Sequence, residues 1–173
     1  GLILGGGMAN TFLLAQGIQI GASLAEPDMV AKARAIMAKA DANGCRIILP
    51  TDLVVATAFA ANASHRVTGG HDIADDEMIL DAGPQSVASV TAFLRDCQTI
   101  VWNGPMGAFE LKPFDAATNA VARAVARLTQ DQQVMSVAGG GDTMAALANA
   151  GVNDHFSYVS TAGGAFLEWL EGK

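Results

Sequence analysis

The sequence has 173 residues, 51% of them hydrophobic, and a formal net charge of −7 at pH 7. This length fits one domain with a sizeable core, and no apolar run approaches the roughly 18 residues of a membrane-spanning helix. The ten lysines and arginines stand singly along the chain, whereas a surface that binds nucleic acid needs clustered cations. The composition therefore argues against a membrane protein and against nucleic acid as a partner.

Short β-rich runs alternate along the chain with segments of helical periodicity. Strands are predicted at Leu2–Leu4, Arg46–Leu49, Leu53–Ala56, Met78–Leu80, Thr99–Trp102, Val134–Ala138 and Phe156–Ser160. The clearest helix runs from Pro27 to Asn43 and ends before Gly44. Its predicted apolar face consists of Met29, Val30, Ala33, Ile36, Met37 and Ala40.

Two further apolar stripes at helical spacing are predicted to pack into the core. The first consists of Val87, Val90, Phe93, Leu94 and Cys97, and the second of Phe114, Ala117, Val121, Val125 and Leu128. The alternation of strands and helices predicts an α/β fold of three αβα layers, with a doubly wound, mostly parallel sheet and right-handed crossovers.

One segment departs from this alternation. Ser64–Glu77, SHRVTGGHDIADDE, is polar, acidic and without period, and we predict a solvated loop there. His65 and His71 have no spacing that indicates a metal site, and His155, which precedes a strand, has none either.

The cysteines and the first residue bear on the setting of the protein. Cys45 and Cys97 lie far apart, so we expect both to be reduced, buried residues of a cytoplasmic protein. No basic segment followed by an apolar one indicates a secretory signal. The chain starts at Gly1, and a strand pattern begins almost at once, so we expect a piece of a longer protein.

Five predicted strands end in turns of small residues: LILGGGMAN, MILDAGPQS, IVWNGPMGAFE, SVAGGGDTM and YVSTAGGAF. Carboxyl ends of parallel strands meet at one edge of a sheet, where ligands bind. Glycine lets the backbone approach a ligand closely, and the helix that follows directs free N–H groups and a partial positive charge toward it. These turns predict a shared site for an anion or a nucleotide.

The spacing of the glycines disfavours two common nucleotide motifs. A dinucleotide fold needs G-x-G-x-x-G, and both GGGMAN and GGGDTM lack the third glycine. A Walker A loop needs a lysine after its last glycine, and this sequence has none there. A nicotinamide oxidoreductase and a P-loop NTPase are therefore both disfavoured.

The residues of the GGGDT and NGPMGAFE turns suit two different parts of a nucleotide. Gly139, Gly140 and Gly141 expose amides, Asp142 can hold Mg²⁺, and Thr143 can donate its hydroxyl to a phosphate. The alternative is that Asp142 or Thr143 caps the helix. Gly104, Pro105, Met106 and Phe109 can form a thin apolar wall for a base, and Glu110 can accept bonds from ribose hydroxyls, whereas Trp102 is expected to pack in the core.

The motifs GGGMANTFL, VWNGPMGAFE, GGGDT and STAGGAFLEWLEGK, in this order, resemble the carboxyl-terminal, nucleotide-binding domain of the phosphoglycerate kinase family. The resemblance covers residues 1–173 and implies that the first βα unit of this Rossmann-like domain and the substrate-binding amino-terminal domain are missing. It also implies a cytoplasmic, monomeric glycolytic enzyme, which moves a phosphoryl group between 1,3-bisphosphoglycerate and MgADP to give 3-phosphoglycerate and MgATP.

The resemblance implies roles for individual residues. Gly6, Gly7 and Gly83 would flank the adenine, Gly104, Met106 and Phe109 would line the same pocket, and Glu110 would bind the ribose. Gly140, Gly141, Asp142 and Thr143 would bind the phosphates and Mg²⁺, with Asp142 as the metal ligand. Gly163 and Gly164 would face the transferring group as catalytic residues.

Two departures from the family pattern matter for activity. The last turn has Ala162 where the family has glycine, and no lysine or arginine falls in a glycine turn. Because phosphoryl transfer depends on charge stabilisation, we expect nucleotide binding but negligible transfer by this chain alone. The alternative is a non-catalytic nucleotide-binding or assembly module.

Overall fold

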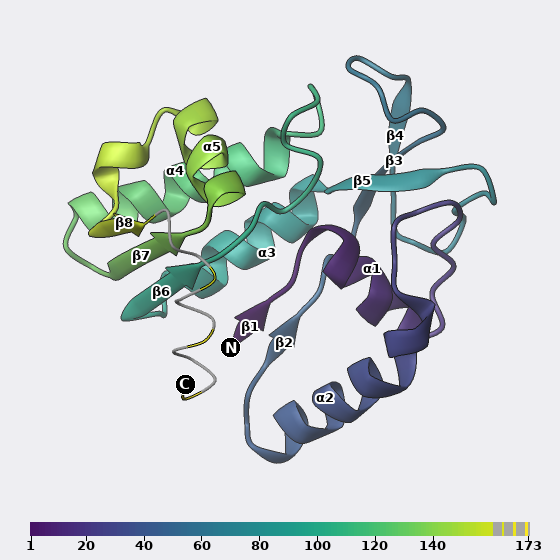
Figure 1. The fold of residues 1–173 in the computed structure, drawn as a ribbon, viewed down its shortest axis with the longest axis horizontal. Coiled ribbons are helices and arrows are strands. Elements are labelled where there is room, and N and C mark those ends of the chain that lie inside the picture. Colours follow the sequence, from purple (N-terminus) through teal and green to yellow (C-terminus); the bar gives the residue numbers. More distant parts are fainter. Residues whose placement is uncertain (161–163, 165–167, 169–171, 173) are drawn as a thin grey trace. The chain divides into compact units, whose positions relative to one another are not determined.

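A computed structural model of the chain describes residues 1–160, 164, 168 and 172. The chain forms two compact units (Figure 1). The first unit consists of Gly1–Ala88 and Met106–Ala117, and the second of Ser89–Pro105 and Thr118–Lys173. Two helices, α3 (Pro84–Leu94) and α4 (Ala116–Gln130), begin in the first unit and end in the second.

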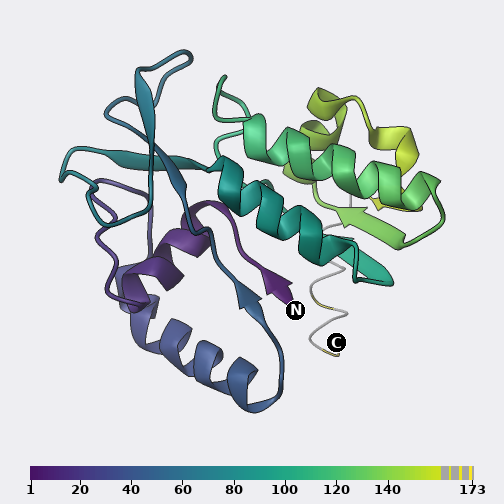
Figure 2. The same ribbon diagram turned by 180° about the vertical axis from the view of Figure 1, so that it is seen from behind.

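The first unit opens with two short parallel strands joined by helices. Strand β1 (Leu2–Ile3) leads into helix α1 (Gly6–Ala15), and a short 3-10 turn, η1 (Pro27–Met29), leads into α2 (Val30–Ala42) and strand β2 (Ile47–Ile48). Strands β1 and β2 pair in parallel. Helix α2 packs alongside α1, as Figure 2 shows from behind, and the two helices bury Phe12 and Ala33 in one cluster.

The predicted helix Pro27–Asn43 is confirmed, but its predicted apolar face is only partly buried. Pro27 stands in the first turn, and Gly44, with a φ of 66°, follows the end of the helix. Ala33 is buried, whereas Ile36 is 38% exposed. Helical spacing therefore identified the helix and overestimated how much of it faces the core.

An antiparallel sheet follows, which the mostly parallel prediction did not include. Strands β3 (Leu53–Ala56), β4 (His65–Thr68) and β5 (Met78–Ala82) lie in the order β4-β3-β5, and both neighbours of β3 run antiparallel to it. The prediction of a solvated loop over Ser64–Glu77 was wrong at its start, because His65–Thr68 forms β4. The polar side chains of an edge strand concealed its extended conformation.

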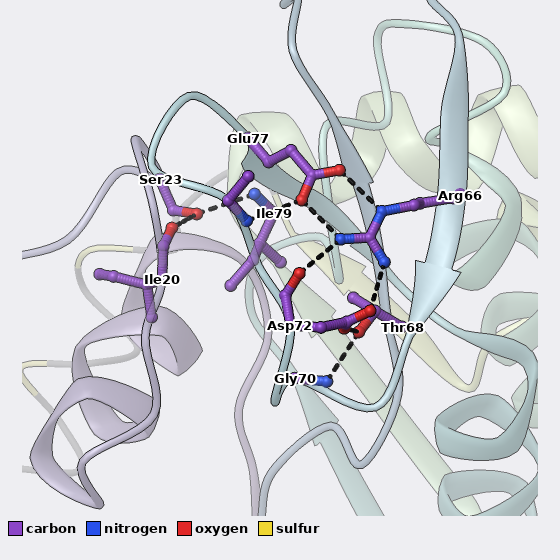
Figure 3. Close-up of polar contacts among 9 residues, drawn as sticks. Ile20, Ser23, Arg66, Thr68, Gly70, Asp72, Glu77 and Ile79 are labelled. Atoms are coloured by element: carbon purple, nitrogen blue, oxygen red, sulfur yellow. Dashed lines mark hydrogen bonds and ion pairs between the residues drawn. The ribbon is translucent and has the colours of Figure 1, made fainter.

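The rest of that segment is tied to β4 by a network around Arg66 (Figure 3). The guanidinium donates two hydrogen bonds of 2.8 and 2.7 Å to the Glu77 carboxylate. It donates two more to Asp72, one to the side chain at 2.9 Å and one to the backbone carbonyl at 2.7 Å. Thr68 also donates to the Asp72 carboxylate. These bonds fix a connection whose apolar anchor is Ile73, which is buried in a core cluster with Leu53 and Val55.

The second unit contains the parallel sheet predicted for the chain. Strands β6 (Thr99–Trp102), β7 (Met135–Gly139) and β8 (Tyr158–Ser160) lie side by side in that order and run parallel. Helix α5 (Gly141–Ala150) and a short 3-10 turn, η2 (Asn153–His155), connect β7 to β8. All seven predicted strands are present, with ends shifted by at most two residues, and the α/β fold class is confirmed.

The predicted stripe that continues along α4 is confirmed, whereas the stripe of α3 is only partly buried: Val90 and Leu94 are buried, and Val87, Phe93 and Cys97 are half-buried. Helix α4 buries Val121, Val125 and Leu128. Trp102 is buried and meets Phe156 edge-on, with 6.3 Å between ring centroids, so the expected core role of Trp102 is confirmed. Both cysteines are free, but their expected burial was wrong for Cys45, which is exposed, and only partly right for Cys97, which is half-buried. In the part of the chain that the structure describes, no helix has the length and hydropathy to cross a membrane.

Candidate functional site

Three strand ends meet at one edge of the second unit's sheet. Trp102 of β6 lies opposite Ala138 of β7, and Gly139 lies opposite Ser160 of β8, so the carboxyl ends of these three strands are neighbours. The Gly140 amide donates to the Ser160 carbonyl at 3.1 Å. The predicted common edge is therefore present for the ends of β6, β7 and β8, and residues 161–163, which follow β8, lie outside the described part of the chain.

Helix α5 presents its amino end at this edge. Gly140 precedes the helix with a φ of 99°, a conformation that favours glycine, and no side chain among the described residues caps the helix. The alternative role of Asp142 and Thr143 as helix caps is therefore not supported. Gly141 and Asp142, in the first turn, are both exposed. The first amides of a helix lack intrahelical acceptors, and with the helix dipole they attract an anion.

Thr143 joins two of these turns. Its side chain is buried, with 1% of the residue exposed, and its hydroxyl oxygen accepts a 2.7 Å hydrogen bond from the Gly104 amide. Gly104 has a φ of 102°, which an L residue rarely adopts. The hydroxyl keeps its own proton for a further acceptor. Thr143 thus fixes the turn after β6 against the turn after β7.

The described residues contain no cluster of three or more histidine, cysteine or acidic side chains that could hold a metal on its own. Asp142 is the carboxylate at the edge described above, and it is exposed. A hard cation bound there would have to complete its shell with water and with oxygens of a ligand such as a phosphate. This donor set suits a metal that arrives with its ligand rather than a permanent metal centre.

In the first unit, the turn after β1 is in close contact with Met106. The Gly6 amide donates to the Met106 carbonyl at 2.8 Å. A Cβ at Gly5 would lie 2.8 Å from the Met106 Cα, which leaves room only for glycine. The structure therefore brings together two of the predicted adenine-site segments, the β1–α1 turn and the loop that starts at Met106.

The side chains around these segments differ in exposure. Met106 and Phe109 are buried, whereas Glu110 is exposed and accessible to a ligand. Leu24, which the sequence interpretation did not single out, is 80% exposed, and its side chain would lie 3.1 Å from a Cβ at Gly7. No sequence motif marks Leu24. It stands out only in the structure, because its side chain lies beside Gly7.

Gly83 has a structural reason to be glycine. A Cβ there would lie 2.3 Å from the Asp52 carboxylate, and the Gly83 amide donates to the Asp52 carbonyl at 2.8 Å. The same carboxylate caps α3, accepting bonds from the Ser86 amide at 2.7 Å and the Gln85 amide at 3.0 Å. Burial acts to raise the pKa of Asp52, but the bonds from Ser86 and Gln85 outweigh it and lower that pKa.

A second buried carboxyl group, Asp81 at the end of β5, was missed by the sequence interpretation. It is 2% exposed and lies against the loop that contains Met106. Burial raises its pKa to about 7, although hydrogen bonds from the Ala117 and Ala82 amides act in the opposite direction. A buried acid in the chain's MILDAGP turn gives no signal in the sequence, because its burial depends on residues far along the chain.

The last predicted turn is only partly described. Gly163 lies outside the described residues, and Gly164 is helical and exposed. Their predicted catalytic role therefore stays a prediction.

The comparisons with known proteins agree on one family. The family model for phosphoglycerate kinase matches residues 1–173. The chain is 65% identical over 172 residues to a phosphoglycerate kinase of Rhodospirillum centenum and 63% identical to one of Xanthobacter flavus, covering 99% of this chain and 43% of each relative. It thus spans less than half the length of these relatives.

Solved structures give the same result. The structure of phosphoglycerate kinase from Coxiella burnetii superimposes with a TM-score of 0.93 at 44% identity, over 99% of this chain and 43% of that one. The enzyme from Pyrococcus horikoshii gives a TM-score of 0.79 at 27% identity, over 99% of this chain and 42% of that one. The chain belongs to the phosphoglycerate kinase family.

Proposed function

We propose that residues 1–173 are the carboxyl-terminal, nucleotide-binding domain of a phosphoglycerate kinase and bind ADP or ATP with Mg²⁺. The observation that carries the proposal is the uncapped amino end of α5, with exposed Gly141 and Asp142, at the edge where β6, β7 and β8 end. The whole enzyme would transfer a phosphoryl group between 1,3-bisphosphoglycerate and MgADP in glycolysis, as a cytoplasmic monomer.

The phosphate end of the nucleotide is assigned to the second unit. Gly140 and Gly141 let the backbone approach the phosphates, and the free amides of the first turn of α5 donate to them. Asp142 holds Mg²⁺, which neutralises phosphate charge when it is bound. Thr143 fixes the Gly104 turn and can use its remaining proton toward a phosphate oxygen.

The adenosine end is assigned to the glycine turns and the loop after β6. Gly6, Gly7 and Gly83 flank the base, and Gly104, Met106 and Phe109 form its apolar surroundings. Glu110, which is exposed, accepts bonds from the ribose hydroxyls. Leu24 adds exposed apolar surface beside Gly7.

The charge balance limits what this chain does alone. No lysine or arginine lies in the glycine turns, so the negative charge of the phosphoryl group in transfer has no side-chain counter-charge there. Loss of such a cation costs on the order of 10³-fold in rate. We therefore propose that the remaining part of the enzyme supplies both the acyl-phosphate substrate site and the cation, and that Gly163 and Gly164 face the transferring group.

Titration calorimetry with MgADP tests the proposal. We expect saturable binding by the 173-residue chain and a clear loss of affinity in Asp142→Ala. Asp131→Ala is a matched control, because Asp131 is an exposed acid that precedes β7 and so lies at the opposite end of that strand. Absence of binding by a folded sample, or equal affinity of the two variants, would contradict the proposal.

A further inference from the structure

The buried carboxyl group of Asp81 connects three segments of the first unit. One oxygen, Oδ1, accepts a 2.9 Å hydrogen bond from the Ala82 amide, and the other, Oδ2, accepts a 2.9 Å bond from the Ala117 amide. Ala117 is the second residue of α4. One side chain thus links the end of β5 to the beginning of α4 and satisfies an amide that has no acceptor within the helix.

The loop that starts at Met106 lies directly on this carboxyl group. A Cβ at Gly107 would lie 2.4 Å from Asp81 Oδ1 and 2.5 Å from the Leu80 carbonyl oxygen, so glycine is required by the closeness of β5. The next residue, Ala108, donates its amide to the same Leu80 carbonyl at 2.8 Å. The loop is therefore held to β5 through its backbone, with Asp81 beneath it.

A small hollow beside the loop is lined by Asp81 together with parts of the proposed adenosine site. Its lining includes Gly6, Asn10, Asp81 and Met106, and it has room for about one water molecule. The hollow is too small for a nucleoside, so Asp81 does not contact a base there. Asp81 instead shares this hollow with the Gly6 turn and lies against the Met106 loop at Gly107, and both segments belong to the proposed adenosine site.

We propose that ionised Asp81 is a positioning residue for the nucleotide: it holds residues 106–110 and the start of α4 in the conformation that binds adenosine, and its protonation weakens binding. The proposal rests on the proposed function, because residues 106–110 must contact the nucleotide for it to hold. Asp81 is not a catalytic residue, since it reaches the ligand only through the loop.

The groups that face Asp81 set the pH at which its carboxyl group takes up a proton. Burial raises the pKa of Asp81 to about 7, the Ala117 and Ala82 amides act to lower it, and the charge of Asp115, just before α4, raises it further. Among the described residues that line the hollow, from α1, β3, β5 and the loops at Pro50 and Met106, Asp81 alone is ionisable. A protonated carboxyl has one oxygen converted to a donor, so it holds two amides less well than a carboxylate does.

Nuclear magnetic resonance of the nucleotide-free chain tests the positioning step without any ligand. We expect the Asp81 carboxyl carbon and the amides of Gly107, Ala108 and Ala117 to titrate with one common midpoint near pH 7. In Asp115→Asn the midpoint should move to lower pH, because a like charge has been removed. If Asp81 titrates while those amides do not follow, or if it is already ionised at pH 5, the inference is wrong.

The binding step is tested by the Kd of MgADP between pH 6 and pH 8 for the wild type and Asp81→Asn. If only the ionised form is competent, the wild-type Kd rises about tenfold from pH 8 to pH 6, because the competent fraction falls by that factor. The ratio of the two Kd values at each pH removes the titration of the nucleotide itself. The ratio should depend on pH with the midpoint seen by resonance.

The outcomes separate the two proposals. No MgADP binding by the folded wild type at pH 8 refutes the proposed function. Binding with a ratio that stays constant between pH 6 and pH 8 refutes the role of Asp81 and leaves the proposed function intact. If Asp81→Asn does not fold, the shift of the wild-type Kd midpoint in Asp115→Asn provides the same test.

Discussion

The buried carboxyl group of Asp81 predicts an unusual dependence of stability on pH. Its pKa is raised from 3.8 to about 7 in the folded chain, so between these values the folded state holds a proton that the unfolded state has released. The free energy of unfolding therefore falls by about 1.4 kcal/mol for each pH unit in that window, and about 4 kcal/mol is lost in total. This loss is complete above about pH 7, once the folded group has ionised.

Replacing Asp81 by asparagine removes this dependence, since the amide resembles the protonated acid in shape and carries no charge. Urea unfolding of both proteins at several pH values measures the effect. We expect the stability of Asp81→Asn relative to the wild type to grow from pH 5 to about pH 7 and then to level off, by about 3 kcal/mol in all, a large part of the 5–15 kcal/mol typical of a domain. A difference that is constant, or that shrinks as the pH rises, would refute the raised pKa and its cause.

Three other predictions concern contacts around the glycine turns. Gly107→Ala should destabilise the chain by about 1–3 kcal/mol, because a Cβ would lie 2.4 Å from the carboxyl group beneath it, whereas Gly69→Ala, which meets nothing within 4 Å, should be nearly neutral in the same urea assay. Ser86→Ala should cost about 1–3 kcal/mol at pH 7, because it removes the hydroxyl that donates to the Asp52 carboxylate at 2.6 Å. The Asp52 pKa is lowered below 3.8, so that stabilisation is present at neutral pH and is lost only in acid; an equal cost at pH 2 and pH 7 would contradict it. Thr143→Val should weaken MgADP binding and Thr143→Ser should not, since only serine keeps an acceptor for the 2.7 Å bond from the turn after β6; equal affinities would argue against that role.

Local periodicity was enough to predict most of the fold. The stripe from Phe114 to Leu128 is buried at each predicted position, because its residues from Ala117 onward repeat along one face of α4. Strand β4 was missed because an edge strand has little apolar alternation, and its residues are held largely by pairing with β3 and by the bonds of Arg66. Neither interaction is visible from the strand's own composition. The antiparallel arrangement of β3 and β5 was missed because the composition of a strand does not show in which direction its neighbour runs.

The site residues could be predicted only where the residues that act together are also close together in the sequence. The glycine turns after β6 and β7 could be identified because glycine, acid and hydroxyl residues occur together in the sequence, and the structure brings Gly104 and Thr143 into contact. Gly83 must be glycine because it packs against Asp52, and these two residues are too far apart in the sequence to form a short motif. Asp81 lies against Gly107, accepts a bond from the Ala117 amide and feels the charge of Asp115, so its perturbed pKa could not be inferred from the strand in which it lies.

The central claim is that the first turn of α5 binds the metal–phosphate end of a nucleotide, and paramagnetic relaxation measures this most directly. Mn²⁺ can replace Mg²⁺ in the complex with ADP, and it broadens the resonances of nuclei close to it. We predict that MnADP broadens the amides of Gly141, Asp142 and Thr143 most strongly, and that MgADP at the same concentration shifts them without broadening. Broadening centred elsewhere on the chain, or none at saturating MnADP, would contradict the claim.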